Sequence, residues 1–184
     1  MKKNSTKLIT LLGVMTALAY ILYFLELPVG FIFPAAPFLK IDFSDIPAIM
    51  VGLSAGPIAG IVVELFKNIL HAMFMMKEPG GSGEIANFAA GISYLIPVIL
   101  ISRKSFRAKK YIPAMILGTI CMVITMSFVN FYITLPLYGI TDSAIKLSMI
   151  STTFAPFNLI KGIVISIVTV LLYPRLRSVI KKFA

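Results

Sequence analysis

The chain has 184 residues, of which 59% are hydrophobic and 13% are charged, and its mean hydropathy is +0.97. These values exclude an ordinary soluble domain and indicate an integral membrane protein. The formal net charge of +10 would suggest nucleic acid in a soluble protein, but we expect no nucleic-acid partner here because the charge follows membrane topology.

The N-terminus combines lysines with an apolar run from Leu8 to Leu25. This order of charge and apolarity is also found in signal peptides, and residues 17–19 (Ala-Leu-Ala) resemble a cleavage site. The run continues for about 18 residues, which is a membrane-spanning length. An uncleaved first helix therefore fits the sequence better.

Six apolar segments follow one another without an internal repeat or a low-complexity tract. They cover roughly residues 8–25, 46–54, 57–76, 84–102, 112–135 and 154–173. The second segment is too short to span a membrane as a straight helix, and a Gly/Pro-rich turn joins it to the third. The prediction is one all-α domain over residues 1–184, a six-transmembrane-helix bundle with a long external loop between helices 1 and 2.

Positive charge gathers at residues 2–7, 103–110 and 175–182, which hold 12 of the 17 basic residues. Short cytoplasmic loops accumulate Lys and Arg, so we expect both termini on the cytoplasmic side of the cell membrane. An even number of crossings must then separate the first two clusters, so the short second segment has to count as a crossing. The first external loop, residues 26–45, is apolar, and we expect it to fold back over the outer end of the bundle.

Several classes of chemistry lack the residues they need. The single cysteine, Cys121, excludes an internal disulfide and is best explained as a small packed hydrophobe. The single histidine, His71, excludes a His-cluster metal site. No hydrolase, zinc-protease or phosphate-binding motif is present. We therefore expect no enzyme activity, no cofactor and no metal, and any ATP hydrolysis must come from another polypeptide.

The third segment carries one polar stripe, formed by Glu64, Lys67, Asn68 and His71. A Glu-Lys pair three residues apart in an apolar setting is best explained by mutual neutralisation. The sequence therefore favours a structural ion pair that faces the bundle over a ligand contact.

The sixth segment contains Asn158 and Lys161 on one helix face, and the fifth places Asn130 near its outer end. Ionisable groups within a membrane segment are costly and usually face a cavity or a partner. The three side chains could line a pocket open to the outside. An interhelical hydrogen bond for Asn158 and a Lys161 side chain that extends toward the interface explain the residues equally well.

The runs from Phe38 to His71 and from Gly81 to Phe88, with Asn-x-x-Lys in the sixth segment, resemble the substrate-binding S components of energy-coupling factor (ECF) transporters. Within that family the chain is most similar to the riboflavin-specific members. The resemblance covers essentially the whole chain. It implies a membrane subunit that captures riboflavin from outside and works with a transmembrane coupling protein and two ATP-binding subunits.

The resemblance also implies roles for individual residues. Asn130, Asn158 and Lys161 match family positions that bind riboflavin. Gly13 and Ala17 match a small-residue pair that contacts the coupling protein, although such spacing on its own is explained by ordinary packing. Four further candidates for ligand contact are equally well explained by loop capping or helix capping: Leu39, Asp42, Glu84 and Asn87.

Two alternatives remain open at this point. One is an S component for another vitamin, although thiamin-type relatives use Trp and this chain has none. The other is a membrane helix bundle without transport function, in which Asn158 and Lys161 would have no ligand. In either case the basic inner surface is also expected to contact membrane lipid.

Overall fold

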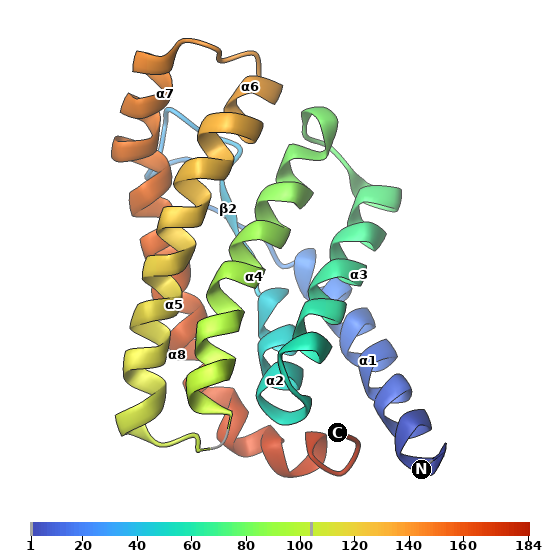
Figure 1. Ribbon diagram of the computed structural model, residues 1–184. Coiled ribbons are helices and arrows are strands. Elements are labelled where there is room, and N and C mark those ends of the chain that lie inside the picture. Colours follow the sequence, from blue (N-terminus) through green and yellow to red (C-terminus); the bar gives the residue numbers. More distant parts are fainter. Residues whose placement is uncertain (1, 104) are drawn as a thin grey trace.

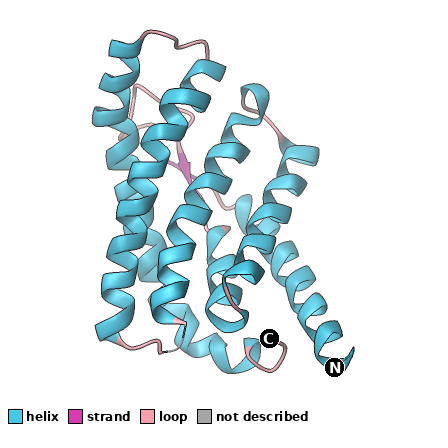
Figure 2. Ribbon diagram, in the orientation of Figure 1, coloured by secondary structure: helices cyan, strands magenta, loops and turns pink. Residues whose placement is uncertain are grey.

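The computed structural model describes residues 2–103 and 105–184, with the backbone alone for residues 2–5; Lys104 of the second basic cluster lies outside these residues. The described chain is a helical bundle (Figure 1). Helices account for almost all of it, with a short strand pair between the first two helices (Figure 2). This arrangement confirms the predicted helical membrane fold and adds a small strand pairing that the sequence did not indicate.

Five helical stretches in the described residues are long and apolar enough to cross a membrane. They are Thr6–Tyr23, Pro57–Met75, Pro79–Ser102, Ala108–Leu137 and Ser143–Ile180. The last two are longer than the predicted 112–135 and 154–173. The predicted boundaries were too narrow there because most of the added helical turns contain charged residues, such as Lys109, Lys146 and Arg175, which interrupt the apolar runs.

The first half of the bundle contains α1 (Lys2–Tyr23), α2 (Asp45–Ala55), α3 (Pro57–Met75) and α4 (Ser82–Ser102), with a 3₁₀ turn (Pro79–Gly81) before α4. Helix α2 has 11 residues, about 16 Å, which is roughly half of a bilayer core. Its residues from Asp45 to Leu53 are all buried. The short second segment is therefore a central half-length helix, and the preceding loop supplies the rest of the passage through the bundle.

The second half consists of two long helical runs, each interrupted by a π-helical turn. The first run is α5 (Ala108–Val129), the π turn Asn130–Thr134 and α6 (Leu135–Leu137). The second run is α7 (Ser143–Met149), the π turn Ile150–Phe154 and α8 (Ala155–Ile180). A π turn widens a helix locally and is frequent at functional sites.

Both termini and the turn between α4 and α5 lie at one end of the bundle, and the turns after α3 and α6 lie at the other (Figure 1). The loop between α1 and α2 packs into this second end, as its apolar sequence predicted. It contains β1 (Leu27–Pro28) and β2 (Lys40–Ile41), which pair antiparallel. The buried cluster that joins the loop to the second half consists of Val29, Phe33, Ala36, Leu39, Ile41, Leu135, Ile150, Phe154 and Phe157.

The turn between α2 and α3 depends on Gly56, whose φ of 118° is a conformation that other L-residues rarely adopt. It reverses the chain so that the short helix α2 packs against the longer helix α3, and α2 is enclosed by its neighbours. Large apolar side chains on the other helices, such as Ile9, Ile58, Ile116 and Phe128, point outward. Such an apolar exterior around a partly polar interior is the surface expected in contact with lipid.

Candidate functional site: a polar cavity under the first loop

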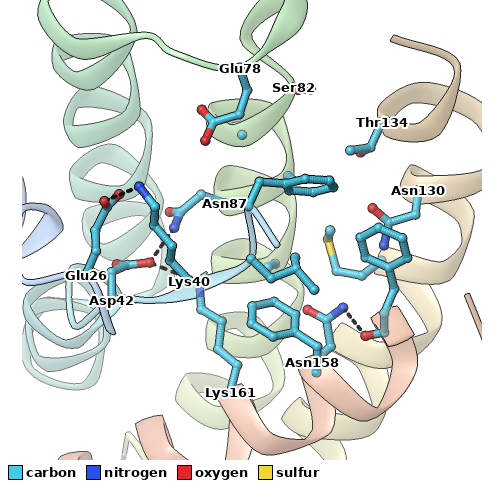
Figure 3. A pocket seen from close by; sticks show the side chains of 18 of the residues that line it. Glu26, Lys40, Asp42, Glu78, Ser82, Asn87, Asn130, Thr134, Asn158 and Lys161 are labelled. Carbon is cyan, nitrogen blue, oxygen red and sulfur yellow. Dashed lines mark hydrogen bonds and ion pairs between the residues drawn. The ribbon is translucent and has the colours of Figure 1, made fainter. Parts of the chain in front are cut away.

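A cavity of about 110 Å³ lies where the loop after α1 meets α4, α5 and α8 (Figure 3). Predicted site residues on its wall are Leu39, Asp42, Asn87, Asn130, Asn158 and Lys161. The structure thus brings together side chains from four separate parts of the chain. Aromatic residues Phe38, Tyr138, Phe154 and Phe157 supply much of the remaining wall.

One side of the cavity carries amide groups from the two helices with π turns. Asn158 Nδ2 donates a hydrogen bond to the Phe154 carbonyl oxygen at 2.8 Å, one turn earlier in the chain. Asn130 is 1% exposed, and its Nδ2 has no hydrogen-bond partner among the described residues. Thr134 Oγ1, one π turn further on, also lacks a partner within the described part of the chain. Buried polar atoms are almost always paired, so these two atoms leave unused hydrogen-bonding capacity on the cavity wall.

The opposite side carries charge, centred on Asp42 (Figure 3). Asp42 Oδ2 accepts hydrogen bonds from Asn87 Nδ2 at 3.0 Å and from Lys161 Nζ at 3.4 Å, while Oδ1 accepts from the Ser44 backbone N–H at 2.9 Å. Burial alone would raise the pKa of the Asp42 carboxyl. Lys161, Lys67 and the Ser44 hydrogen bonds outweigh that effect and lower the pKa to about 2.

Lys161 connects the cavity with a buried ion network beneath it. Its Nζ lies 3.3 Å from Asp45 Oδ2, and Asp45 also forms an ion pair with Lys67. Lys67 Nζ lies 2.9 Å from Glu64 Oε2 and donates to Ser44 Oγ at 2.8 Å. The predicted Glu64–Lys67 ion pair is therefore confirmed. The sequence reasoning missed Asp45 and Ser44, because neither lies on the same helix as the pair.

Two predicted residues occupy other positions. Glu84 is outside the cavity lining, and its Oε1 lies 2.7 Å from His71 Nδ1. His71 does line the cavity and stacks on Tyr23, with ring centroids 3.9 Å apart. Glu84 therefore holds the His71 side chain in place without lining the cavity itself. The interaction was not predicted because 13 residues separate the partners and two helices must meet to form it.

The cavity mouth is bordered by Glu26 and Lys40, which form an ion pair at the strand pairing of the loop. The Glu26–Lys40 pair holds the two strands of the loop together. The Asp42 contacts attach the loop to α4 and α8. A ligand that enters the cavity from this end must pass the loop.

Gly13 and Ala17 lie on α1, away from the cavity. Both are exposed, and a Cβ built on Gly13 would meet no atom within 4 Å. Ordinary packing inside the chain therefore does not use this face of α1.

Comparison with known proteins agrees with this architecture. Residues 7–173 match the family model of the substrate-specific component of ECF transporters. One solved structure ("Structure and mechanism of the S component of a bacterial ECF transporter") superposes with a TM-score of 0.81 at 40% identity, covering 96% of this chain and 99% of that one. The present chain belongs to the family of ECF substrate-specific (S) components, which are substrate-binding membrane subunits rather than enzymes.

Individual relatives narrow the comparison within the family. The chain is 41% identical to the riboflavin transporter RibU of Staphylococcus aureus, covering 98% of this chain and 95% of the relative. It is 37% identical to the riboflavin transporter FmnP of Bacillus subtilis, with 96% and 95% covered.

Proposed function

We propose that the protein binds riboflavin in the cavity under the first loop and serves as the substrate-binding subunit of an ECF importer. The observation that carries the proposal is the unpartnered Asn130 Nδ2 on a wall shared with Asn158, Thr134 and aromatic rings. The flavin ring edge presents two carbonyls that flank an N–H group. Asn side chains complement such an edge because each carries a donor and an acceptor.

The charged wall suits the polar parts of the same ligand. Lys161 can donate to ring or ribityl oxygens without requiring an anionic ligand. The surrounding aromatic side chains provide flat apolar surface for the ring system. Among the predicted contacts, we propose Asn130, Asn158, Lys161 and Leu39 as direct ligand residues, and Asp42, Asn87 and Glu84 as residues that hold the loop, Lys161 or His71 in place.

The cavity volume sets a condition on binding. Sites for small molecules usually enclose about 300–1,000 Å³, whereas this cavity encloses about 110 Å³. A tricyclic ligand therefore requires the loop or the aromatic wall to move outward. We expect riboflavin to bind with a measurable change in the environment of the loop residues.

The relatives' names support riboflavin as the substrate, and an S component of the same architecture for another vitamin is the competing assignment. Titration of ligand-free detergent-purified protein with riboflavin and with thiamin distinguishes the two. A saturable, stoichiometric riboflavin response that Asn130→Ala weakens supports the proposal. If the protein does not bind riboflavin but binds another vitamin saturably, the family assignment stands and the substrate assignment is wrong.

We further propose that residues 1–184 act as one membrane domain with both termini in the cytoplasm and with a coupling protein and two ATP-binding subunits as partners. The positions of the basic clusters at the termini and between α4 and α5 support this orientation. Reporter fusions at the C-terminus and in the turn after α6 test it. The C-terminal fusion should be active only with a cytoplasmic reporter, and the α6 fusion only with an external one.

A further inference from the structure

A second hollow lies outside the substrate cavity, on the membrane-facing side of the bundle. It is a groove of about 520 Å³ between α5 and α8. Its lining is almost wholly apolar: Tyr111, Ile112, Met115, Ile116, Thr119, Ile120, Leu159, Ile163, Ser166, Ile167, Val170 and Leu171. The two helices make close contact at Gly162, where a Cβ would lie 2.6 Å from Thr119, so the groove is a furrow along a tightly packed helix pair.

The length and position of the groove match one leaflet of a bilayer. Its lining on α5 runs from Tyr111 to Ile120, nine helical steps or about 14 Å. That is close to half of a hydrocarbon core about 30 Å thick. Tyr111 lies in the first turn of α5. That end of α5 lies at the same end of the bundle as the chain termini (Figure 1).

Each of the two helices carries a basic residue beyond that end of the groove. On α5, Lys109 precedes Ile112 by three residues and so lies on the lining face. On α8, Ile163, Ile167 and Leu171 line the groove at steps of four. Arg175 lies four residues further on, just after Pro174, where the last turns of α8 bend away from α5 (Figure 1). Both basic side chains belong to exposed residues.

This positive charge lacks acidic residues nearby in the chain. From residue 85 to the C-terminus the sequence contains one acid, Asp142, and it lies between α6 and α7 at the opposite end of the bundle. An apolar groove about one leaflet long, whose two helices each carry an exposed basic residue beyond its inner end, is complementary to a lipid with an anionic headgroup. We propose that the groove binds one acyl chain of an anionic phospholipid, with the headgroup held between Lys109 and Arg175.

Tryptophan fluorescence provides the test, because the wild-type chain contains no Trp. The Ile116→Trp variant places a probe in the groove. The Leu65→Trp variant is its match, since both residues lie eight positions after the inner start of their helices and both are exposed. Each flavin-free variant is reconstituted in vesicles that contain a small fraction of acyl-brominated phosphatidylglycerol or acyl-brominated phosphatidylcholine.

At Ile116→Trp we expect phosphatidylglycerol to associate at least about five-fold more strongly than phosphatidylcholine, since each Lys or Arg near an anionic lipid adds about five-fold. At Leu65→Trp the ratio should be near one. Adding Lys109→Gln and Arg175→Gln should abolish the preference at the groove. Adding Lys181→Gln and Lys182→Gln removes an equal amount of charge elsewhere and should leave the preference for phosphatidylglycerol at the groove unchanged.

Four results would overturn the proposal. Equal quenching by the two lipids in the groove means that bulk lipid fills it. An equal preference at both probes, or an equal loss with both charge pairs, means that the basic end attracts anionic lipid without a defined site. Loss of quenching on addition of the coupling subunits means that the groove is a protein-docking surface. If Ile116→Trp does not fold, as judged by circular dichroism, Ile120→Trp takes its place in the groove.

Discussion

The Asp42 carboxylate lies 3.4 Å from the Lys161 ammonium, although 119 residues separate them in the chain. This pair attaches the first loop to α8, and the same Asp42 oxygen accepts a hydrogen bond from Asn87 on α4. One carboxylate of the loop that covers the cavity therefore contacts two helices, in addition to the apolar cluster that packs the loop against the second half of the bundle.

Asp42→Asn should weaken riboflavin binding by about 10- to 100-fold, because a hydrogen bond to a charged group contributes about 1.5–3 kcal/mol. Most of the loss should be a faster dissociation rate, since the loop is no longer fixed over the ligand. Stopped-flow fluorescence measures this rate directly. Asp142→Asn is the control, because Asp142 is exposed and caps α7 away from the cavity. Equal dissociation rates for wild type and Asp42→Asn would contradict the expected role.

The unpartnered amide of Asn130 leads to a second prediction. Asn130→Ala should raise the riboflavin dissociation constant by about 5- to 100-fold, the range expected for loss of a buried hydrogen bond of about 1–3 kcal/mol. Ser127→Ala on the same helix removes a polar group that bonds to the Val123 carbonyl and should not affect binding. Fluorescence titration checks both variants. A similar loss in the two would indicate that α5 is disturbed rather than that a ligand contact is removed.

The low pKa of Asp42 makes stability depend on pH. Its pKa is about 2 in the folded protein, below the ordinary 3.8, so its stabilising effect is complete above about pH 5 and is lost as the pH falls through 3.8 toward 2. The lost contribution should be about 2 kcal/mol. Thermal unfolding in detergent between pH 6 and pH 2.5 should show a steeper acid loss for wild type than for Asp42→Asn. Parallel curves would mean that Asp42 is not paired in the folded protein.

The sequence indicated several residues of the cavity wall because Asn130, Asn158 and Lys161 are polar residues within apolar helices, where they are conspicuous. It predicted less about the residues that hold them. Asp45 follows a loop and is the first residue of α2, so its sequence position indicates a helix start rather than a buried ion pair. The apolar pattern predicted that the second segment, α2, is too short to span the membrane. How the preceding loop packs into the bundle depends on tertiary contacts, which the periodicity of the sequence does not reveal.

The exposed face of α1 leads to a prediction about assembly. If Gly13 and Ala17 form a contact surface for the coupling protein, Gly13→Leu should reduce co-purification of the coupling subunits by at least about ten-fold, because bulk prevents close helix approach. Riboflavin binding by the isolated subunit should be unchanged. Ala144→Leu adds similar bulk to an exposed site at the opposite end of the bundle and serves as the control. Normal assembly of Gly13→Leu would place the coupling surface elsewhere.

The buried ion network makes Lys67 a determinant of stability. Lys67 is 0% exposed and neutralises Asp45 and Glu64 at the centre of the bundle. Lys67→Met should lower the free energy of unfolding by about 3–5 kcal/mol, because removal of one partner leaves buried charge uncompensated. Lys77→Met, at an exposed position after α3, should have little effect on the melting temperature in detergent.

A second substitution separates charge from packing. Adding Glu64→Gln to Lys67→Met removes one of the unpaired charges at almost constant volume, so the double variant should recover part of the lost stability. The space for Glu64 is provided by Gly91, where a Cβ would lie 2.6 Å from Glu64 Oε2. Gly91→Ala should therefore displace the carboxylate and destabilise the protein as well. If Lys67→Met melts at the wild-type temperature, or if Glu64→Gln gives no recovery, the network does not stabilise the bundle through charge compensation.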